Sequence, residues 1–167
     1  MATPRSGEPT ASSSASELDA ADRRLLNALQ QDSSRSLAEL AEATGLTPQT
    51  CHRRLQRLRK NGVILREVAI VDPRRSEHRL TVLLQVLLER LTEAGRLAFE
   101  RKLHAMPEVS DVFITSGDVD YVLLLRLKDT DDYYRFVQEV CVADESVKHF
   151  KSIMVLRRSK NETAIPF

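Results

Sequence analysis

The feature that most constrains the fold is the order of hydrophobic patterns along residues 80–156. The run "LTVLLQVLLE" suits a buried strand, and residues 91–106 show helical spacing that stops at Pro107. The segments "VSDVFITS" and "YVLLLRLK", joined by the turn "GDVD", predict a β-hairpin. Asp129 or Thr130 is predicted to cap a second helix, and "VKHFKSIMVL" predicts a final strand. This β-α-β-β-α-β order predicts a ferredoxin-like domain.

Both helices of this predicted domain have one apolar face. Helical spacing turns the following residues toward the core: Phe99, Leu103 and Met106 on the first helix, and Tyr133, Phe136, Val137, Val140 and Cys141 on the second. Two helices cover only one face of a four-stranded sheet. The other face needs a partner, and a second copy of the chain would supply it, so we expect at least a homodimer.

Capping residues divide the preceding part of the chain into helices. Asp19 is a suitable N-cap for a helix that ends near Gln31. Ser36 and Glu39 have the spacing of a capping box, and Gly45 suits the left-handed position that ends a helix. Two helices are therefore predicted before Gly45.

A third helix is predicted to begin at Thr47, because threonine is a good N-cap and Pro48 is favoured at the first helical position. Cys51, Leu55 and Leu58 share its inward face, where a cysteine acts as a small hydrophobic residue rather than a redox group. Two short helices joined by a turn with a glycine, the second of them basic, form a helix-turn-helix motif, which we place at about residues 37–56.

The segment between Glu42 and Glu67 contains no acidic residue. The net charge of the whole chain is only +1, yet residues 18–75 hold 11 Lys and Arg against 7 Asp and Glu. Six cations fall between the two glutamates: Arg53, Arg54, Arg57, Arg59, Lys60 and Arg66. Because nothing nearby in the sequence compensates them, we expect the third helix to bind the DNA major groove. The alternative interpretation is a solvated basic face on a structural helix.

The predicted DNA contacts differ in their expected partners. Gln and Arg side chains read adenine and guanine, so Gln49, Arg53 and Gln56 are expected at base edges. Thr50, Arg54, Arg57 and Lys60 are expected at the phosphate backbone. The full set of candidates is Thr47, Gln49, Thr50, His52, Arg53, Arg54, Gln56, Arg57 and Lys60.

The segment that follows Gly62 is predicted to be a linker strand. The sequence "VILREVAIVDP" alternates enough for a strand, and Pro73 would end it. The polar run "RRSEHR" then predicts a hinge between two domains.

Composition excludes several classes of protein. The chain is 42% hydrophobic and 29% charged, as is typical of soluble globular proteins, and it has no apolar run near the roughly 18 residues of a membrane span. Its two cysteines make no disulfide framework, and no Cys/His cluster has zinc spacing, so we expect no metal or cofactor and a reducing, cytoplasmic location. Residues 1–17 lack the apolar core of a secretory signal and are predicted to be a disordered tail.

The sequence "SGDVDY" is the only concentrated polar spot of the second half. Gly117 permits close approach of the backbone, and Asp118 and Asp120 could accept hydrogen bonds from a ligand ammonium group. The same residues also suit an ordinary hairpin turn. No nucleophile, histidine or metal set accompanies the two aspartates, so no catalytic residue is expected.

Three segments together carry a family resemblance: "LDAADRRLLNALQQDSSRSLAELAEATGLTPQTCHRRLQRLRKNGVI", "VDP" and "TSGDVDYVLLLRL". They resemble the Lrp/AsnC family of bacterial and archaeal regulators over about residues 18–165. The resemblance implies an α+β fold, with an N-terminal (winged) helix-turn-helix domain followed by a ferredoxin-like domain of the RAM type. It also implies a transcription regulator that senses an amino acid or a related metabolite and assembles into homodimers, octamers or larger species.

The resemblance further implies an effector site at the turn between the second and third strands. The residues that match the family's pattern there are Ser116, Gly117, Asp118, Asp120 and Tyr121, with Met154 on the last strand. One departure is Thr50, where many relatives have a proline, so a base preference does not carry over. The closing "KNETAIPF" is similar to the tail of a subgroup that often controls amino-acid catabolic genes.

The expected organisation is a disordered tail (1–17), a helix-turn-helix DNA-binding domain with its linker strand (18–79), an effector-binding and oligomerisation domain (80–160) and a C-terminal tail (161–167). The expected partners are double-stranded DNA and an amino-acid effector, with no membrane, and the expected location is the nucleoid. The alternative is a nucleoid-architectural protein that wraps DNA without any effector.

Overall fold

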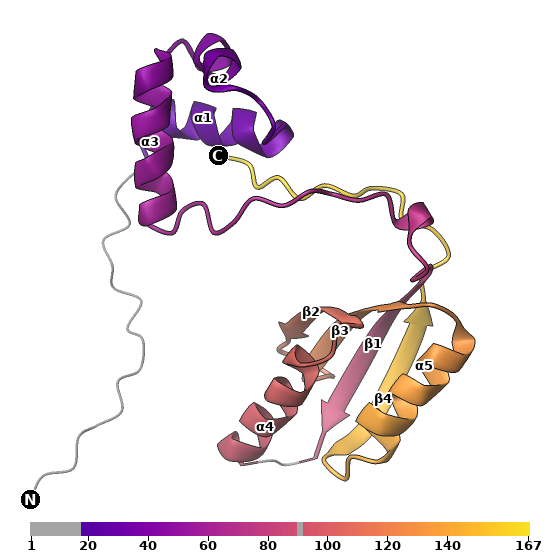
Figure 1. Cartoon of the computed structure of the whole chain (residues 1–167). Coiled ribbons are helices and arrows are strands. Elements are labelled where there is room, and N and C mark those ends of the chain that lie inside the picture. Colours follow the sequence, from indigo (N-terminus) through magenta and orange to yellow (C-terminus); the bar gives the residue numbers. More distant parts are fainter. Residues whose placement is uncertain (1–17, 90–91) are drawn as a thin grey trace, which may run out of the picture. The chain divides into compact units, whose positions relative to one another are not determined.

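The computed structural model of the chain describes residues 18–89 and 92–167 (Figure 1). The predictions of a disordered tail at residues 1–17 and of a helix start at Leu91 lie outside the described residues. The chain divides into two compact units. One, the three-helix unit, extends to Ala69 and also includes Asn161–Phe167, and the other, the sheet unit, is Ile70–Lys160.

The helices of the three-helix unit are α1 (Ala20–Gln31), α2 (Leu37–Thr44) and α3 (Pro48–Lys60). The predicted N-caps Asp19, Ser36 and Thr47 are confirmed, because each side chain accepts a hydrogen bond from a backbone N–H in the first turn. Gly45 ends α2 with a φ of 70°, the left-handed conformation expected of it. These caps fix where each helix begins and how sharply α2 turns into α3.

The core of the three-helix unit is made by apolar faces of all three helices. Its buried residues are Leu25, Leu26, Ala28, Leu29, Leu40, Ala41, Cys51, Leu55 and Leu58. Cys51 is fully buried, and its Sγ lies 3.8 Å from the buried Thr44 Oγ1. The prediction that Cys51 is a core residue is confirmed.

The sheet unit has the predicted β-α-β-β-α-β order. Its elements are β1 (Leu80–Leu88), α4 (Glu93–His104), β2 (Val109–Ile114), β3 (Tyr121–Leu127), α5 (Thr130–Val137), a π-helical turn (Gln138–Val142) and β4 (Val147–Met154). All neighbouring strands are antiparallel, in the order β2-β3-β1-β4. The α+β fold class is therefore confirmed. A short 3-10 helix (Pro73–Arg75) precedes β1.

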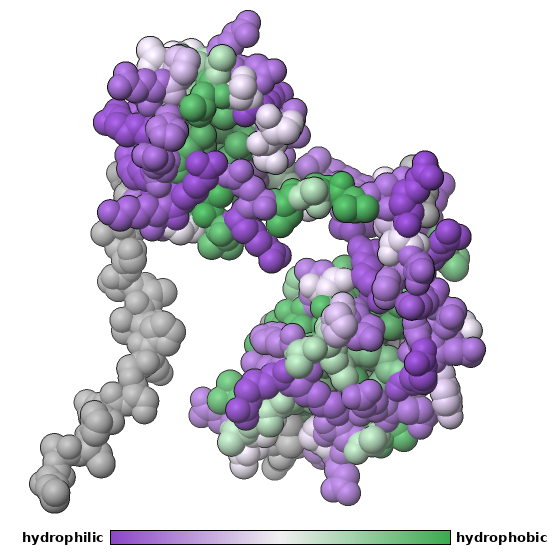
Figure 2. Space-filling view, in the orientation of Figure 1, coloured by the Kyte–Doolittle hydropathy of each residue, from purple (hydrophilic) through white to green (hydrophobic). Residues whose placement is uncertain are grey.

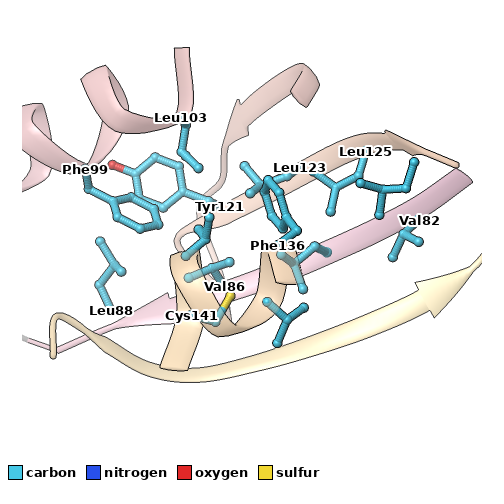
Figure 3. Close-up of a cluster of buried hydrophobic side chains, with 14 residues drawn as sticks. Val82, Val86, Leu88, Phe99, Leu103, Tyr121, Leu123, Leu125, Phe136 and Cys141 are labelled. Atoms are coloured by element: carbon cyan, nitrogen blue, oxygen red, sulfur yellow. The ribbon is translucent and has the colours of Figure 1, made fainter. Parts of the chain in front are cut away.

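The core of the sheet unit lies between the sheet and the two helices that cover one of its faces (Figures 1 and 3). On β1 and β3 every second residue is buried. Phe99 and Leu103 of α4, and Phe136 and Cys141 of the second helical segment, fill the space above these residues (Figure 3). Met106, predicted at the end of the first helical stripe, lies beyond the end of α4 but still packs on this core.

The opposite face of the sheet is not covered by either helix. Strand register shows which residues share it: Asp111 and Phe113 of β2, Val122, Leu124 and Arg126 of β3, Thr81, Leu83, Gln85 and Leu87 of β1, and His149, Lys151 and Ile153 of β4. We call these twelve residues the open sheet face. Phe113 is 51% exposed and Ile153 is 40% exposed, so the face presents apolar side chains to solvent in the single chain.

The linker strand predicted after Gly62 is wrong. Residues 63–72 form no strand, because a strand needs a neighbour for its backbone hydrogen bonds and the four-stranded sheet uses none of these residues. Consequently the helix-turn-helix carries no β-wing in the described part of the chain. The alternating apolar residues remain exposed, Leu65 at 89% and Ile70 at 70%, and Figure 2 shows a green surface along this connecting segment.

Candidate functional site

The outer face of α3 is a row of exposed polar side chains. Cys51, Leu55 and Leu58 anchor the inner face, so the residues half a turn away must face solvent. Those residues are Gln49, Arg53, Gln56 and Lys60, all exposed, with His52 exposed at the flank and Thr50 half-buried. At 100° per residue these four lie within a narrow stripe along the helix. An α-helix with its side chains is about 10–12 Å across, a width that the major groove of DNA admits.

The start of α3 is held by a pair of hydroxyl groups. Thr47 Oγ1 accepts a hydrogen bond from Thr50 N at 3.2 Å and donates to Thr50 Oγ1 at 2.9 Å. Thr47 and Thr50, both predicted to contact DNA, are therefore part of the helix cap. Their remaining hydrogen-bonding capacity lies at the N-terminal end of the helix, where the helix dipole favours an anion such as phosphate.

The basic residues of α3 are not uncompensated, as the sequence had suggested. Asp22 of α1, whose side chain is only 1% exposed, accepts hydrogen bonds from two of them. The Arg54 Nη1 atom lies 2.8 Å from Asp22 Oδ1, and Arg57 Nη2 lies 2.5 Å from Asp22 Oδ2. We call this set of ion pairs the Asp22 brace. It ties α3 to α1, and it occupies two cations that were expected at the DNA backbone.

Two more acidic residues complete the correction. Arg54 Nη1 also lies 2.6 Å from Asp19 Oδ2, and Arg59 Nη2 lies 2.6 Å from Glu67 Oε1. The Asp22 backbone N–H and the Arg54 guanidinium lower the pKa of Asp19 to about 2, and the carboxylates of Asp19 and Asp22 raise the pKa of Arg54. Arg53 and Lys60 have no ion pair within the described ranges 18–89 and 92–167. These two cations are the ones best placed to meet an anionic partner.

The Asp22 brace could not be predicted from acids near each cation in the chain. Asp19 and Asp22 lie more than 30 positions before Arg54, and tertiary packing brings them together. A signal was present in the sequence, since the two aspartates are spaced three apart on a helix whose neighbour carries only cations. That spacing places both carboxylates on one side of α1.

The loop between β2 and β3 is the second candidate site. It is closed by hydrogen bonds from Thr115 N to Asp120 O, at 2.9 Å, and from Thr115 Oγ1 to Val119 O, at 2.5 Å. Ser116, Gly117 and Asp118 are exposed at its tip. Gly117 has a φ of 147°, a conformation that residues with a side chain rarely adopt. The tip therefore offers backbone groups and one carboxylate to solvent.

Asp120 plays a different part from Asp118. Its Oδ2 accepts a hydrogen bond from Leu88 N at 2.7 Å, and its own N–H donates to Val86 O at 2.9 Å. The half-buried carboxylate thus fixes the loop to the end of β1, beside the irregularity in strand register between Leu87 and Leu88. Within the single chain Asp120 positions the loop, and Asp118 is its exposed acceptor.

Tyr121 and Met154 lie apart from the tip of this loop. The Tyr121 ring is buried 5.5 Å from the Phe99 ring, centroid to centroid, and its hydroxyl donates to Glu100 Oε1 at 2.8 Å (Figure 3). Met154 pairs with Val82, four residues along β1 from Val86, or about 13 Å at the usual rise of a strand. One chain alone therefore does not bring Met154 to the loop.

The buried hydroxyl makes a testable prediction about alkaline stability. Burial, and then the hydrogen bond to Glu100, raise the pKa of Tyr121 from 10.0 to about 12. A raised pKa in the folded state means stability that is complete below pH 10 and lost as the pH rises toward 12. The free energy of unfolding, measured with denaturant at a series of pH values, should fall less steeply above pH 10 in Tyr121→Phe than in the unaltered protein. Tyr134→Phe, at an exposed position, should keep the slope of the unaltered protein. Equal slopes for the two variants would contradict the assignment.

Comparison with known proteins follows the same division into two parts. Residues 18–59 match the AsnC-type helix-turn-helix domain, and residues 81–165 match the Lrp/AsnC ligand binding domain. The chain belongs to the Lrp/AsnC family. The resemblance inferred from the sequence is thereby confirmed.

Relatives of this Lrp/AsnC protein cover nearly the whole chain. It is 35% identical over 148 residues to an HTH-type transcriptional regulator from Haemophilus influenzae, covering 89% of this chain and 88% of the relative. An AsnC family regulator from Agrobacterium tumefaciens superposes with a TM-score of 0.83 at 31% identity, covering 89% and 96% of the two chains. A transcriptional regulator from Neisseria meningitidis in complex with L-Met gives a TM-score of 0.84 at 28% identity, with the same coverage.

Family membership states what the two units do in general terms. The protein is a DNA-binding transcriptional regulator of the Lrp/AsnC type, with a helix-turn-helix domain and a ligand-binding domain. The family consists of transcriptional regulators rather than enzymes. Among the described residues no helix has the length and apolar content to span a membrane.

Proposed function

We propose that this regulator binds a specific operator as a homodimer and that an amino acid bound at the β2–β3 loop modulates its occupancy of DNA. The observation that carries the DNA part is the stripe of exposed side chains on α3, set on a helix braced from behind by Asp22. Such a regulator would work in the cytoplasm, on the nucleoid. The brace changes which residues we assign to DNA.

The assignment of DNA contacts follows exposure and charge. Gln49, Arg53 and Gln56 are proposed to reach base edges, since glutamine and arginine side chains make two hydrogen bonds to adenine and guanine. Lys60, His52, and the hydroxyls of Thr47 and Thr50 are proposed to contact phosphates. Arg54 is proposed to position α3 through Asp22 and Asp19, and Arg57, which is 44% exposed, to serve both the brace and a phosphate.

Removal of Arg53 tests the base-reading assignment. Arg53→Ala should weaken operator binding about 10- to 100-fold, which corresponds to the roughly 1–3 kcal/mol of one good base contact. Fluorescence anisotropy on the chain's own upstream DNA and on scrambled DNA measures the change. The matched control is Arg96→Ala, the same change on the exposed side of α4, which should leave affinity unchanged. An equal effect of both variants would refute a specific role for Arg53.

The amino-acid part of the proposal rests on the loop and on a relative. The exposed Asp118 carboxylate could accept the α-ammonium group of an amino acid, and backbone N–H groups beside Gly117 could bind its carboxylate. The Neisseria regulator that shares 28% identity was crystallised with L-Met. Ser116, Asp120, Tyr121 and Met154 complete the proposed effector set. Asp120 and Tyr121 act by positioning, and Met154 reaches the loop only from another copy.

The dimer part rests on the open sheet face and on the linker. Both present apolar side chains to solvent in the single chain, Phe113 and Ile153 on the sheet and Leu65 and Ile70 in the linker. A second copy related by a twofold axis would cover identical surfaces at once. The dimer would then place two α3 helices at half-sites about 34–36 Å apart, and larger assemblies such as octamers would be built from dimers.

The experiment that tests the whole proposal measures operator binding across salt concentrations, with and without each of the twenty amino acids. Preference for the chain's own upstream DNA that shifts with one amino acid is the expected result. Equal affinity for both duplexes, falling steeply with salt and indifferent to amino acids, would instead support the architectural alternative. Failure to bind either duplex at low salt would refute the assignment of α3.

A further inference from the structure

Residues 161–167 belong with the three-helix unit although they follow β4 of the sheet unit in the sequence. The side chain of Gln30 forms two hydrogen bonds to them. Gln30 Nε2 donates to Ile165 O at 2.9 Å, and Ile165 N donates to Gln30 Oε1 at 2.7 Å. A carboxamide has a donor and an acceptor side by side, so it satisfies both backbone groups of one residue, as a neighbouring strand would. We call this pair of hydrogen bonds the Gln30 clip.

The position of the clip matters because α1 also carries the Asp22 brace. Gln30 is the last but one residue of α1, and Asp22 lies two turns earlier on the same helix. The buried Leu25, Leu26 and Leu29 fix α1 in the core. Because α1 carries both the clip and the brace, a displacement of the tail at Ile165 would also displace α1, and with it α3.

The tail is the shorter of the two connections between the units. From Met154, at the end of β4, to the clipped Ile165 there are 11 residue steps, which reach at most about 40 Å when extended. From Ile64, which packs on the core of the three-helix unit, to Leu80 at the start of β1 there are 16 steps, which reach about 55 Å. When the clip is closed, the tail keeps Ile165 within about 40 Å of Met154, a tighter limit than the linker sets between Ile64 and Leu80.

We infer that residues 161–167 are a releasable strap, which docks on α1 through Gln30 and restricts how far the DNA-binding helices can move from β4. The closed strap links the position of the three-helix unit to β4, the strand that ends at Met154. With the strap closed, the two α3 helices of a dimer sample fewer spacings, so more of the dimers match the two half-sites. With it open, that preorganisation is lost and operator binding weakens. The effect on DNA rests on the proposed function, whereas the clip itself does not.

The test removes the clip without touching α3. Gln30→Leu keeps the size of the side chain and removes both hydrogen bonds, and Ile165→Pro removes the N–H donor on the strap side. Gln31→Leu is the matched control, the same change at the next, exposed position. Amide hydrogen exchange at Ile165 in the full chain reports the clip, and small-angle scattering reports the range of separations. Anisotropy on operator DNA reports the consequence.

In Gln30→Leu we expect exchange at Ile165 about tenfold faster, the effect of losing two modest hydrogen bonds. We also expect a larger radius of gyration and operator affinity lowered about three- to tenfold with an unchanged salt slope, since no phosphate contact is lost. Ile165→Pro should give the same increase in radius of gyration and the same loss of operator affinity as Gln30→Leu. The double variant should show no further change in either quantity. Unchanged exchange in Gln30→Leu, or faster exchange with unchanged radius and affinity, would overturn the strap. If the unaltered protein binds no DNA, the proposed function fails. Hydrogen exchange at Ile165 and small-angle scattering still test whether the strap is docked on α1.

Discussion

Asp22→Ala should destabilise the three-helix unit by about 3 kcal/mol and abolish specific DNA binding. The reason is that Asp22 is a buried carboxylate whose loss leaves Arg54 and Arg57 without their shared partner. Breaking a buried ion pair from one side costs about 3–5 kcal/mol, and the lower end applies here because Arg54 is 20% and Arg57 44% exposed. The Asp22 carboxylate also accepts a hydrogen bond from Asp19 N in the capping box, which is lost as well.

Denaturant unfolding followed by circular dichroism measures the loss of stability, and anisotropy on operator DNA measures the loss of binding. Asp32→Ala is the matched control at the other end of α1, because the Asp32 carboxylate is exposed and bonds only locally to Ser34 among the described residues. It should cost well under 1 kcal/mol. If Asp22→Ala were as mild as the control, the brace would not be what positions α3.

Leu124→Asp should convert the dimer to monomers and lower operator affinity about 100-fold or more. Leu124 lies at the centre of the open sheet face, paired with Leu83 on β1 and Asp111 on β2. A carboxylate there would have to be buried without a partner when two copies meet, which is strongly unfavourable. A monomer has only one α3 helix for the operator and loses the gain that comes from linking two binding events.

Sedimentation velocity measures the oligomeric state, and the anisotropy titration measures the affinity. Leu97→Asp is the matched control: Leu97 is 51% exposed on α4, so the same change falls outside the open sheet face. Leu97→Asp should remain dimeric and bind DNA normally. A dimeric Leu124→Asp would show that the copies associate through another surface, such as the linker at residues 63–72.

Local sequence signals predicted the helices and strands well, because each signal acts over a few residues. The caps at Asp19, Ser36 and Thr47 lie where they were expected, and so do the buried residues of α3. The one clear failure among the elements, the strand after Gly62, shows the limit of such signals. Alternation of apolar residues indicates that one side will be covered, but a strand also requires a partner, which one sequence does not specify.

The sequence indicated which segments form the candidate sites better than it indicated the role of each residue in them. The sequence located the helix and the loop as elements of the fold, and the matching family models describe a helix-turn-helix domain and a ligand binding domain. It expected Arg53 at base edges and Arg54 at phosphates, but it did not show that Arg54 pairs with acids of α1, because those acids lie far away in the sequence. Exposure separates the two arginines, since Arg53 faces solvent and Arg54 turns back to Asp22. In the same way Asp120 is tied to Leu88 while Asp118 is exposed.

Apart from the segment after Gly62, the sequence by itself determined where the chain forms helices and strands, the order of the two domains, and which helix carries the polar stripe. These depend on capping, turn residues and hydrophobic period, which are properties of neighbours in the chain. Only the tertiary structure decided which cations of α3 already pair with acids of α1, and that Gln30 clips the strap at Ile165. Each of these depends on groups that are far apart in the sequence and meet only when helices and strands pack, so no local pattern encodes them.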